Sequence, residues 1–348
     1  MPTVNPPNPT VCLYLVASPL QYLAARRIAE KFESGARQIL IHYKKGVAPV
    51  VREGDWDAVW YMPWPRFYPL PGPFGVHRRL LENLGRVAEL AGPCETLRLH
   101  AAMYDSELTN YFLRALPRLT GARQLQARIL PDGIISVRRY PLSPFKRALQ
   151  YLRKLRRLIS PQLDYWRFGG DRLGTDAPFV DRIYVLPGLP HQYPRAKVVE
   201  LPPLVTPATI ATPAGGGLRA LVIGQPLVGC ELATPEDLAE ITAHIHGWLR
   251  QRGVASIDYK GHPKDPNDEL MDPQDRRLEL DEPIETFMTR NPYDFVVGVR
   301  SSALLFARQI YGPDTQVLAF DWDRIRFKTA AERHDMERAF LQCGVRML

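Results

Sequence analysis

The sequence predicts an α/β protein of two domains, each built on a parallel β-sheet covered by helices. Apolar runs of five to seven residues alternate with amphipathic helical stretches in both halves of the 348-residue chain. Between the halves, the segment 201–217 contains four prolines and a run of three glycines, which support neither helix nor strand. We therefore expect an N-terminal domain at 1–200, a linker at 201–217 and a C-terminal domain at 218–348. In an alternative arrangement, the final helix packs back on the N-terminal domain.

Strands and helices alternate in the N-terminal half. The apolar run from Val11 to Ala17 is typical of a buried strand, and Ser18-Pro19 supplies a helix N-cap and a first helical residue. Further strands are expected at 38–43, 58–62, 96–100 and 126–130, and helices at 20–32, 76–90 and 105–116. Such alternation indicates a parallel sheet with helices on both faces.

The C-terminal half follows the same scheme. Strands are expected at 218–223, 256–260, 294–299 and 316–320, and helices at 234–252, 283–289, 302–311 and 328–342. Thr234 is the expected cap of the first of these helices, with two acidic residues in its first turn. In open parallel sheets, ligands bind beyond the carboxyl ends of the strands, so functional residues are sought there.

Composition limits the setting and the partners. The net charge of +8 favours anionic partners such as nucleic acid, anionic lipid or an acidic substrate. The four cysteines have no metal-binding spacing, and we expect reduced, buried thiols in a cytosolic protein without a metal site: Cys12, Cys94, Cys230 and Cys343. The first ten residues lack a basic signal-peptide start, and no apolar run approaches the ~20 residues of a membrane span.

The element Lys260-Gly261-His262-Pro263 follows directly after an expected strand. Gly261 lets the backbone approach a ligand closely, and the lysine and histidine can neutralise a phosphate. His262 can also protonate it, because imidazole titrates near neutral pH. The alternative interpretation is an ordinary turn with a solvated lysine and a capping histidine.

Two hydroxyls and an acid complete this cluster. Ser301-Ser302 ends the strand 294–299 and opens a helix, where free backbone amides favour an anion. A plain helix cap is the alternative. Glu285 lies at the start of the preceding helix, where it is either a ligand-binding acid or a favourable first-turn charge.

In order along the chain, Lys260-Gly261-His262-Pro263, Pro283-Ile284-Glu285 and Ser301-Ser302 resemble the motifs of bacterial sialyltransferases and polysialyltransferases. Ser18-Pro19-Leu20-Gln21 and Gly224-Gln225-Pro226, each after the first strand of its half, are similar to the same group. The resemblance implies a GT-B fold, with two Rossmann-like domains whose parallel sheets face a central cleft. It also implies a CMP-sialic acid donor as co-substrate, with no cofactor required.

The resemblance assigns roles to single residues. Lys260 is expected to contact the cytidine and Glu285 the ribose. His262 is expected to bind the phosphate or protonate the departing CMP, and Ser301-Ser302 to bind the phosphate. The full donor-binding set is Lys260, Gly261, His262, Pro263, Glu285, Ser301, Ser302, Ser18, Gln21 and Gly224.

Ser18 and Gln21 lie at the first strand-to-helix turn of the N-terminal half. Hydroxyl, amide and helix N-terminus together could bind the carboxylate of the sugar. A capping role for Ser18 is the alternative.

Asp132 is the expected catalytic base, in the element Pro131-Asp132-Gly133 after a strand. An acceptor hydroxyl needs a base within hydrogen-bond reach. The family motif has two acids before the glycine, and here Pro131 takes the place of the first. If the first acid is the base, Asp105 or Glu107 is the expected substitute, and an Asp-Gly turn is the structural alternative.

A basic amphipathic helix is expected at 145–159. It either lies on anionic lipid, lines a groove for a polyanionic glycan, or has only a solvated basic face. The residues expected to contact acceptor or membrane are Arg153, Lys154, Arg156 and Arg157. No motif for reading nucleic acid accompanies the charge, so nucleic acid is not expected as a partner.

The sequence therefore predicts an inverting transferase that moves a sialic acid from CMP to a saccharide, polyanionic or lipid-linked, of a bacterial capsule or lipopolysaccharide. The expected setting is the cytoplasm, with peripheral contact to the inner face of the membrane. The alternatives are a transferase of CMP-Kdo or another nonulosonate, a catalytically silent relative that binds glycan or membrane, and a basic nucleic-acid binder. Acceptor, linkage, polymerisation and oligomeric state are not predicted.

Overall fold

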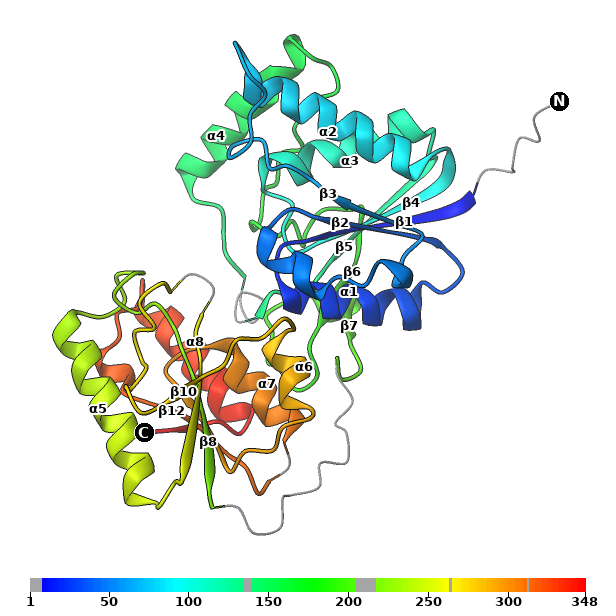
Figure 1. Ribbon diagram of the computed structural model, residues 1–348. Coiled ribbons are helices and arrows are strands. Elements are labelled where there is room, and N and C mark those ends of the chain that lie inside the picture. The colour runs from blue at the N-terminus through cyan, green and yellow to red at the C-terminus, as the bar shows by residue number, and fades with distance from the viewer. Residues whose placement is uncertain (1–7, 134–138, 205–216, 263–264, 312) are drawn as a thin grey trace. The chain divides into compact units, whose positions relative to one another are not determined.

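The protein has two parallel sheets, as the sequence predicts (Figure 1). The computed structural model describes residues 8–133, 139–204, 217–262, 265–311 and 313–348. The chain divides into two compact units. Unit 1 comprises residues 1–187 and 191–204, and unit 2 comprises 188–190 and 205–348.

Unit 1 contains a seven-stranded sheet in the order β3-β2-β1-β4-β5-β6-β7. Its strands are β1 (Asn8–Val16), β2 (Arg37–His42), β3 (Ala58–Tyr61), β4 (Cys94–Ala101), β5 (Gln124–Ile129), β6 (Val180–Val185) and β7 (Val198–Glu200). The chain adds strands on one side of β1 and then continues on the other from β4. This reversal creates a switch point between the carboxyl ends of β1 and β4, where open sheets bind ligands.

Helices cover both faces of this sheet. Helix α1 (Pro19–Phe32) lies on one face, and α2 (Gly75–Ala91) and α3 (Glu107–Thr120) lie on the other (Figure 1). Because both faces are covered, the segment Val11–Val16 of β1 is wholly buried. The predicted basic helix exists as α4 (Pro144–Leu155), followed by one 3₁₀ turn, Arg156–Leu158.

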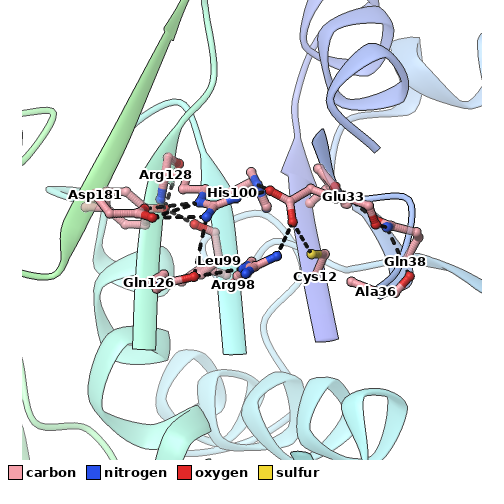
Figure 2. A network of polar contacts seen from close by, with 12 residues as sticks. Cys12, Glu33, Ala36, Gln38, Arg98, Leu99, His100, Gln126, Arg128 and Asp181 are labelled. Carbon is pink, nitrogen blue, oxygen red and sulfur yellow. Dashed lines mark hydrogen bonds and ion pairs between the residues drawn. The ribbon is translucent and has the colours of Figure 1, made fainter. Parts of the chain in front are cut away.

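A buried network of charges ties the strands of unit 1 together (Figure 2). Glu33, at the C-terminal end of α1, is paired with Arg98 of β4 and Arg128 of β5. The Nε atom of Arg128 donates to the Oδ1 atom of Asp181 on β6, at 3.1 Å. The side chains of Glu33 and Arg128 are at most 1% exposed, so loss of either one would leave the other with less compensation for a buried charge.

Unit 2 contains a six-stranded sheet in the order β10-β9-β8-β11-β12-β13. The strands are β8 (Arg219–Ile223), β9 (Ser256–Lys260), β10 (Arg276–Arg277), β11 (Phe295–Gly298), β12 (Gln316–Ala319) and β13 (Arg346–Met347). The helices are α5 (Pro235–Gln251), α6 (Ile284–Met288), α7 (Ser302–Ile310) and α8 (Ala330–Gln342). The switch point of this sheet lies between the carboxyl ends of β8 and β11.

Most predicted elements exist within one to four residues of their expected ends, and the exceptions have physical reasons. The edge strands β7, β10 and β13 have only two or three residues, too few for a hydrophobic pattern. Strand β6 was missed because Asp181 and Arg182 interrupt its apolar run. Helix α3 begins at Glu107 rather than at 105, because Asp105 turns its carboxylate toward Tyr165.

The cysteines differ from expectation in one respect. Cys12 and Cys94 are buried free thiols, as predicted, but Cys230 is exposed and Cys343 is half-buried. Cys230 follows the tight turn after β8, where the backbone returns to the surface. None of the helices in the described parts of the chain is long and apolar enough to cross a bilayer.

Candidate functional site

The carboxyl ends of β9 and β8 meet at the edge of the unit 2 sheet. The backbone N–H of Gly224, directly after β8, donates to the carbonyl oxygen of Lys260 at 2.9 Å. A Cβ atom at position 224 would lie 2.2 Å from the hydroxyl oxygen of Tyr259, so only glycine fits. This close approach places the residues after β8 beside the Lys260-Gly261-His262 element.

The side chain of Lys260 turns back on its own loop. Its Nζ atom donates to the carbonyl oxygen of Gly261 at 2.9 Å, and burial lowers the pKa of Lys260. The carbonyl oxygen of His262 accepts from the backbone of Asp265 at 2.8 Å, which fixes the course of the loop. Pro263, the fourth residue of the predicted element, lies outside the described residues.

Ser301 and Ser302 lie at the end of the neighbouring strand, β11. Ser301 is the N-cap of α7, and its Oγ atom accepts from the backbone of Ala303 at 3.3 Å. Ser302 is the first residue of the helix and is half-buried. The capping interpretation of Ser301 is thus realised, and the amides at the start of a nine-residue helix still favour an anion.

Gln225 joins these two loops, and the sequence analysis gave it no role. Its side-chain oxygen accepts from the backbone N–H of Arg300 at 3.1 Å. It thereby connects the turn after β8 to the residue before Ser301, across the switch point. Its place directly after Gly224 in the Gly-Gln-Pro element was the only feature of the sequence that pointed to this role.

Glu285 lies on the short helix α6, which packs beside α7. Its side chain is buried, and burial raises the pKa of Glu285. A buried carboxyl group can accept hydrogen bonds from the hydroxyls of a sugar. The structure thus brings Gly224, Lys260, Gly261, His262 and Ser301-Ser302 to one edge of unit 2, with Glu285 on the adjoining helix.

A second group of polar residues lies at the carboxyl edge of the unit 1 sheet. Asp132 follows β5 and accepts a hydrogen bond from Gln21 of α1. Burial raises the pKa of Asp132, while Gln21 and the positive charge of Lys44, after β2, lower it. Burial raises the pKa of Tyr43 and of Tyr193, and the negative charge of Asp132 adds to the effect on each.

Ser18 and Gln21 form hydrogen bonds within unit 1. The Oγ atom of Ser18 accepts from the backbone of Gln21 at 3.2 Å and so caps α1. The side-chain oxygen of Gln21 accepts from Ala17 at 2.7 Å, which leaves its NH₂ group to donate to Asp132. Lys44 was missed, because no local pattern connects it to a residue 88 positions away.

The two substitute acids are held by arginines. Asp105 accepts from the hydroxyl of Tyr165 at 3.1 Å and has guanidinium groups of Arg153 and Arg172 at 3.8 and 3.6 Å. Glu107 pairs with Arg156. Both carboxylates are therefore engaged by partners within unit 1.

The basic residues of the α4 region point toward acids of unit 1. Beyond the pairs of Arg153 and Arg156 above, Lys154 lies 3.7 Å and Arg157 4.0 Å from Asp164. The four basic residues predicted to contact acceptor or membrane therefore pair with acids within unit 1. The reason is that the amphipathic helix lies the other way round, with several apolar side chains exposed.

One family model matches part of the chain. Residues 207–319, about a third of the chain, match the family model of alpha-2,8-polysialyltransferase (POLYST). The match spans β8 to β12 and so contains the whole edge cluster of unit 2. No curated protein matches the chain.

Solved structures are also similar to the chain. The glycotransferase of kitacinnamycin is 14% identical with a TM-score of 0.52, and the likeness covers 98% of this chain and 86% of that one. Spinosyn rhamnosyltransferase SpnG complexed with thymidine diphosphate is 16% identical with a TM-score of 0.48, covering 97% of this chain and 85% of that one. The first likeness and the two parallel sheets confirm the GT-B class of fold. Residues 207–319 are thus similar to the alpha-2,8-polysialyltransferase family, and the chain as a whole has the GT-B type of fold.

Proposed function

We propose that the protein transfers a sialic acid from CMP to a saccharide acceptor, with inversion at the anomeric carbon. The observation that carries this proposal is the convergence of Gly224, Lys260–His262 and Ser301-Ser302 at the ends of three adjacent strands of unit 2. This edge lies inside the segment that matches the polysialyltransferase family model.

The residues of this edge suit a nucleotide monophosphate. The N-terminus of α7 and the two serine hydroxyls offer donors for phosphate oxygens. His262 can donate a proton or a hydrogen bond to the same group as CMP departs. Lys260 is assigned to the cytidine and Glu285 to the ribose hydroxyls. A single phosphate carries less charge than a diphosphate, so the proposal includes no metal or other cofactor.

Asp132 is assigned the role of base. As the acceptor oxygen forms its bond to the anomeric carbon, the bond from that carbon to the CMP phosphate breaks, and Asp132 takes the hydroxyl proton. A pKa raised by burial makes the carboxylate a stronger proton acceptor than a solvated aspartate. Gln21 is assigned to positioning this carboxylate instead of binding the sugar carboxylate.

The proposed acceptor is a polyanionic or lipid-linked saccharide of a capsule or lipopolysaccharide, met at the cytoplasmic face of the membrane. An anionic acceptor or surface of this kind would attract the chain, which carries a net positive charge. Contact with the membrane through the region 145–159 is part of this proposal.

A donor panel tests the function directly. The purified protein is incubated with CMP-sialic acid, CMP-Kdo, a UDP-sugar or a GDP-sugar, each with a saccharide acceptor, and nucleotide release is followed. Release of CMP from CMP-sialic acid, and NMR evidence of inverted configuration in the product, are expected. Release only from CMP-Kdo would reassign the sugar. Turnover of a UDP- or GDP-sugar alone would overturn the donor assignment.

His262→Ala serves as the matched site variant. Transfer from CMP-sialic acid is expected to fall by roughly 10²-fold or more, as for loss of a general acid. His334→Ala, at a helical position of α8 outside the cluster, is the control and is expected to keep the wild-type rate.

A further inference from the structure

The segment from α4 to Ser160 exposes apolar side chains to solvent. Its exposed large apolar residues are Phe145, Tyr151, Leu152, Leu155, Leu158 and Ile159. Leu158 and Ile159 are 77% and 74% exposed, although side chains of this kind are usually buried. The inward face of the same segment carries Arg153 and Arg156, which pair with acids of unit 1. The helix therefore presents its apolar side, rather than its basic side, to the surroundings.

A second segment, before and at the start of α2, does the same. Its exposed large apolar residues are Phe67, Tyr68, Phe74 and Val76. Phe67 and Phe74 are 73% and 79% exposed. Four prolines and two glycines between positions 64 and 75 set the course of this loop.

The two segments adjoin each other in space, although about 80 residues separate them in sequence. The Nε2 atom of His77 lies 2.9 Å from the Oγ atom of Ser160. Ile159 is one residue and Phe74 three residues from this contact, which is within roughly 10 Å along the chain. Of the thirteen large apolar side chains exposed in the described parts of the chain, ten belong to these two segments.

The charge of the two segments indicates which kind of partner they bind. Residues 64–79 and 143–160 contain nine Lys or Arg and no Asp or Glu. The remaining 36 basic and 37 acidic residues nearly balance, so the positive excess of the chain resides in these segments. Arg66 and Arg147 are exposed beside the apolar residues. Exposed apolar side chains with exposed arginines beside them match the interface of an anionic bilayer.

We propose that residues 64–79 and 143–160 form one docking surface of unit 1 for an anionic lipid bilayer. Phe67, Phe74, Leu158 and Ile159 enter the boundary between headgroups and acyl chains, and Arg66 and Arg147 meet the lipid phosphates. The surface gives the membrane setting proposed above a defined location, and it adds a loop that the basic helix alone did not suggest. Binding depends mainly on apolar insertion, because much of the basic charge is paired internally.

Vesicle binding of the full-length chain tests the proposal without donor or acceptor, so its result is separate from that of the transfer assay. Wild-type protein is cosedimented with vesicles of phosphatidylcholine alone or with 30% phosphatidylglycerol. We expect clear binding to the anionic vesicles, weakened but not abolished in 0.5 M NaCl. The double variants Leu158→Ser/Ile159→Ser and Phe67→Ser/Phe74→Ser are each expected to lower partitioning at least tenfold. All four positions are exposed, so thermal midpoints are expected to stay unchanged.

Leu341→Ser is the matched control, because Leu341 is 54% exposed but lies on α8 of unit 2. It is expected to bind vesicles like the wild type. Absence of wild-type binding, or equal binding by all variants, would overturn the proposal. So would sedimentation velocity showing a wild-type dimer that both double variants convert to monomer, since the face would then contact a second copy of the chain.

Discussion

The carboxyl edges of the two sheets are built in different ways. At the edge of unit 2, short continuous stretches of backbone form the cluster: the turn at Gly224, the loop after β9 and the first residues of α7. At the edge of unit 1, single side chains from separate segments converge on Asp132, among them Gln21 and Lys44. One edge is a backbone cradle, and the other is an arrangement of side chains.

This difference suits two kinds of chemistry. A phosphate needs several donors at fixed positions, which backbone amides and a helix N-terminus provide within a few consecutive residues. A catalytic base needs an adjusted pKa, which depends on burial and on charges that only tertiary structure brings together. Substitutions at the unit 2 edge should therefore change donor affinity, and substitutions at the unit 1 edge should change the rate and its pH dependence.

Asp132→Asn tests this division with the largest expected effect. We expect kcat to fall by at least ~10²-fold, because no proton acceptor remains beside the acceptor hydroxyl. The Kd for CMP, measured by titration calorimetry, is expected to change less than about twofold, since Asp132 lies in unit 1 and the donor cluster in unit 2.

Glu107→Gln is the control for this prediction. Glu107 is the half-exposed acid that pairs with Arg156 and was the substitute candidate for the base. It is expected to keep kcat within about twofold. Loss of transfer in Glu107→Gln, with activity retained in Asp132→Asn, would move the base to Glu107.

The interior of unit 1 offers the next largest effect. Glu33→Gln leaves Arg98 and Arg128 without their shared carboxylate in the middle of the sheet. Loss of one member of a buried ion pair costs about 3–5 kcal/mol in stability. We expect a lower unfolding midpoint in urea, together with reduced transfer, because two of the elements that Glu33 joins, α1 and β5, position Gln21 and Asp132. Glu30→Gln, on the exposed side of the same helix, should leave the midpoint unchanged.

The features that depend on local sequence pattern could be predicted from the sequence. The strand β9 and the caps at Thr234 and Ser18 were predicted at the observed positions, because hydrophobic runs and capping side chains act over a few residues. The grouping of Lys260, Gly224 and Ser301 followed from the rule that parallel strands end at one edge.

The remaining features depend on contacts that are distant in sequence. Neither the hydrogen bond from Gln21 to Asp132 nor the effect of Lys44 follows from any spacing. The orientation of α4 was also not predictable, since both of its faces could pack: the acids Asp105, Glu107 and Asp164 that attract its arginines lie in other segments.

Ser302→Ala probes the backbone cradle of unit 2 and should have an intermediate effect. A hydrogen bond to a charged group contributes about 1.5–3 kcal/mol, so CMP affinity is expected to fall roughly tenfold or more. The folded state should keep its stability, because Ser301, not Ser302, caps α7. Ser301→Ala is expected to weaken CMP and also cost about 1 kcal/mol in stability. If only the stability of Ser301→Ala changes, the hydroxyls serve the helix alone.

The smallest expected effect, a shift of the pH profile, discriminates most sharply between the two edges. Burial raises the pKa of Asp132 above the ordinary 3.8, and both Gln21 and Lys44 lower it. Removing either contribution raises that pKa further. Because the base acts only when deprotonated, kcat/KM then falls at a higher pH on the acid side, while the plateau above it is unchanged. We expect Lys44→Met and Gln21→Leu each to move the acid limb to higher pH. Lys44→Met is the cleaner variant, because Gln21 also accepts a hydrogen bond from Ala17 at the start of α1.

The exposed neighbour Lys45, changed to Met, is the control and should leave the acid limb in place. An acid limb that moves with Ser302→Ala, but not with Lys44→Met, would assign the titrating group to the donor edge.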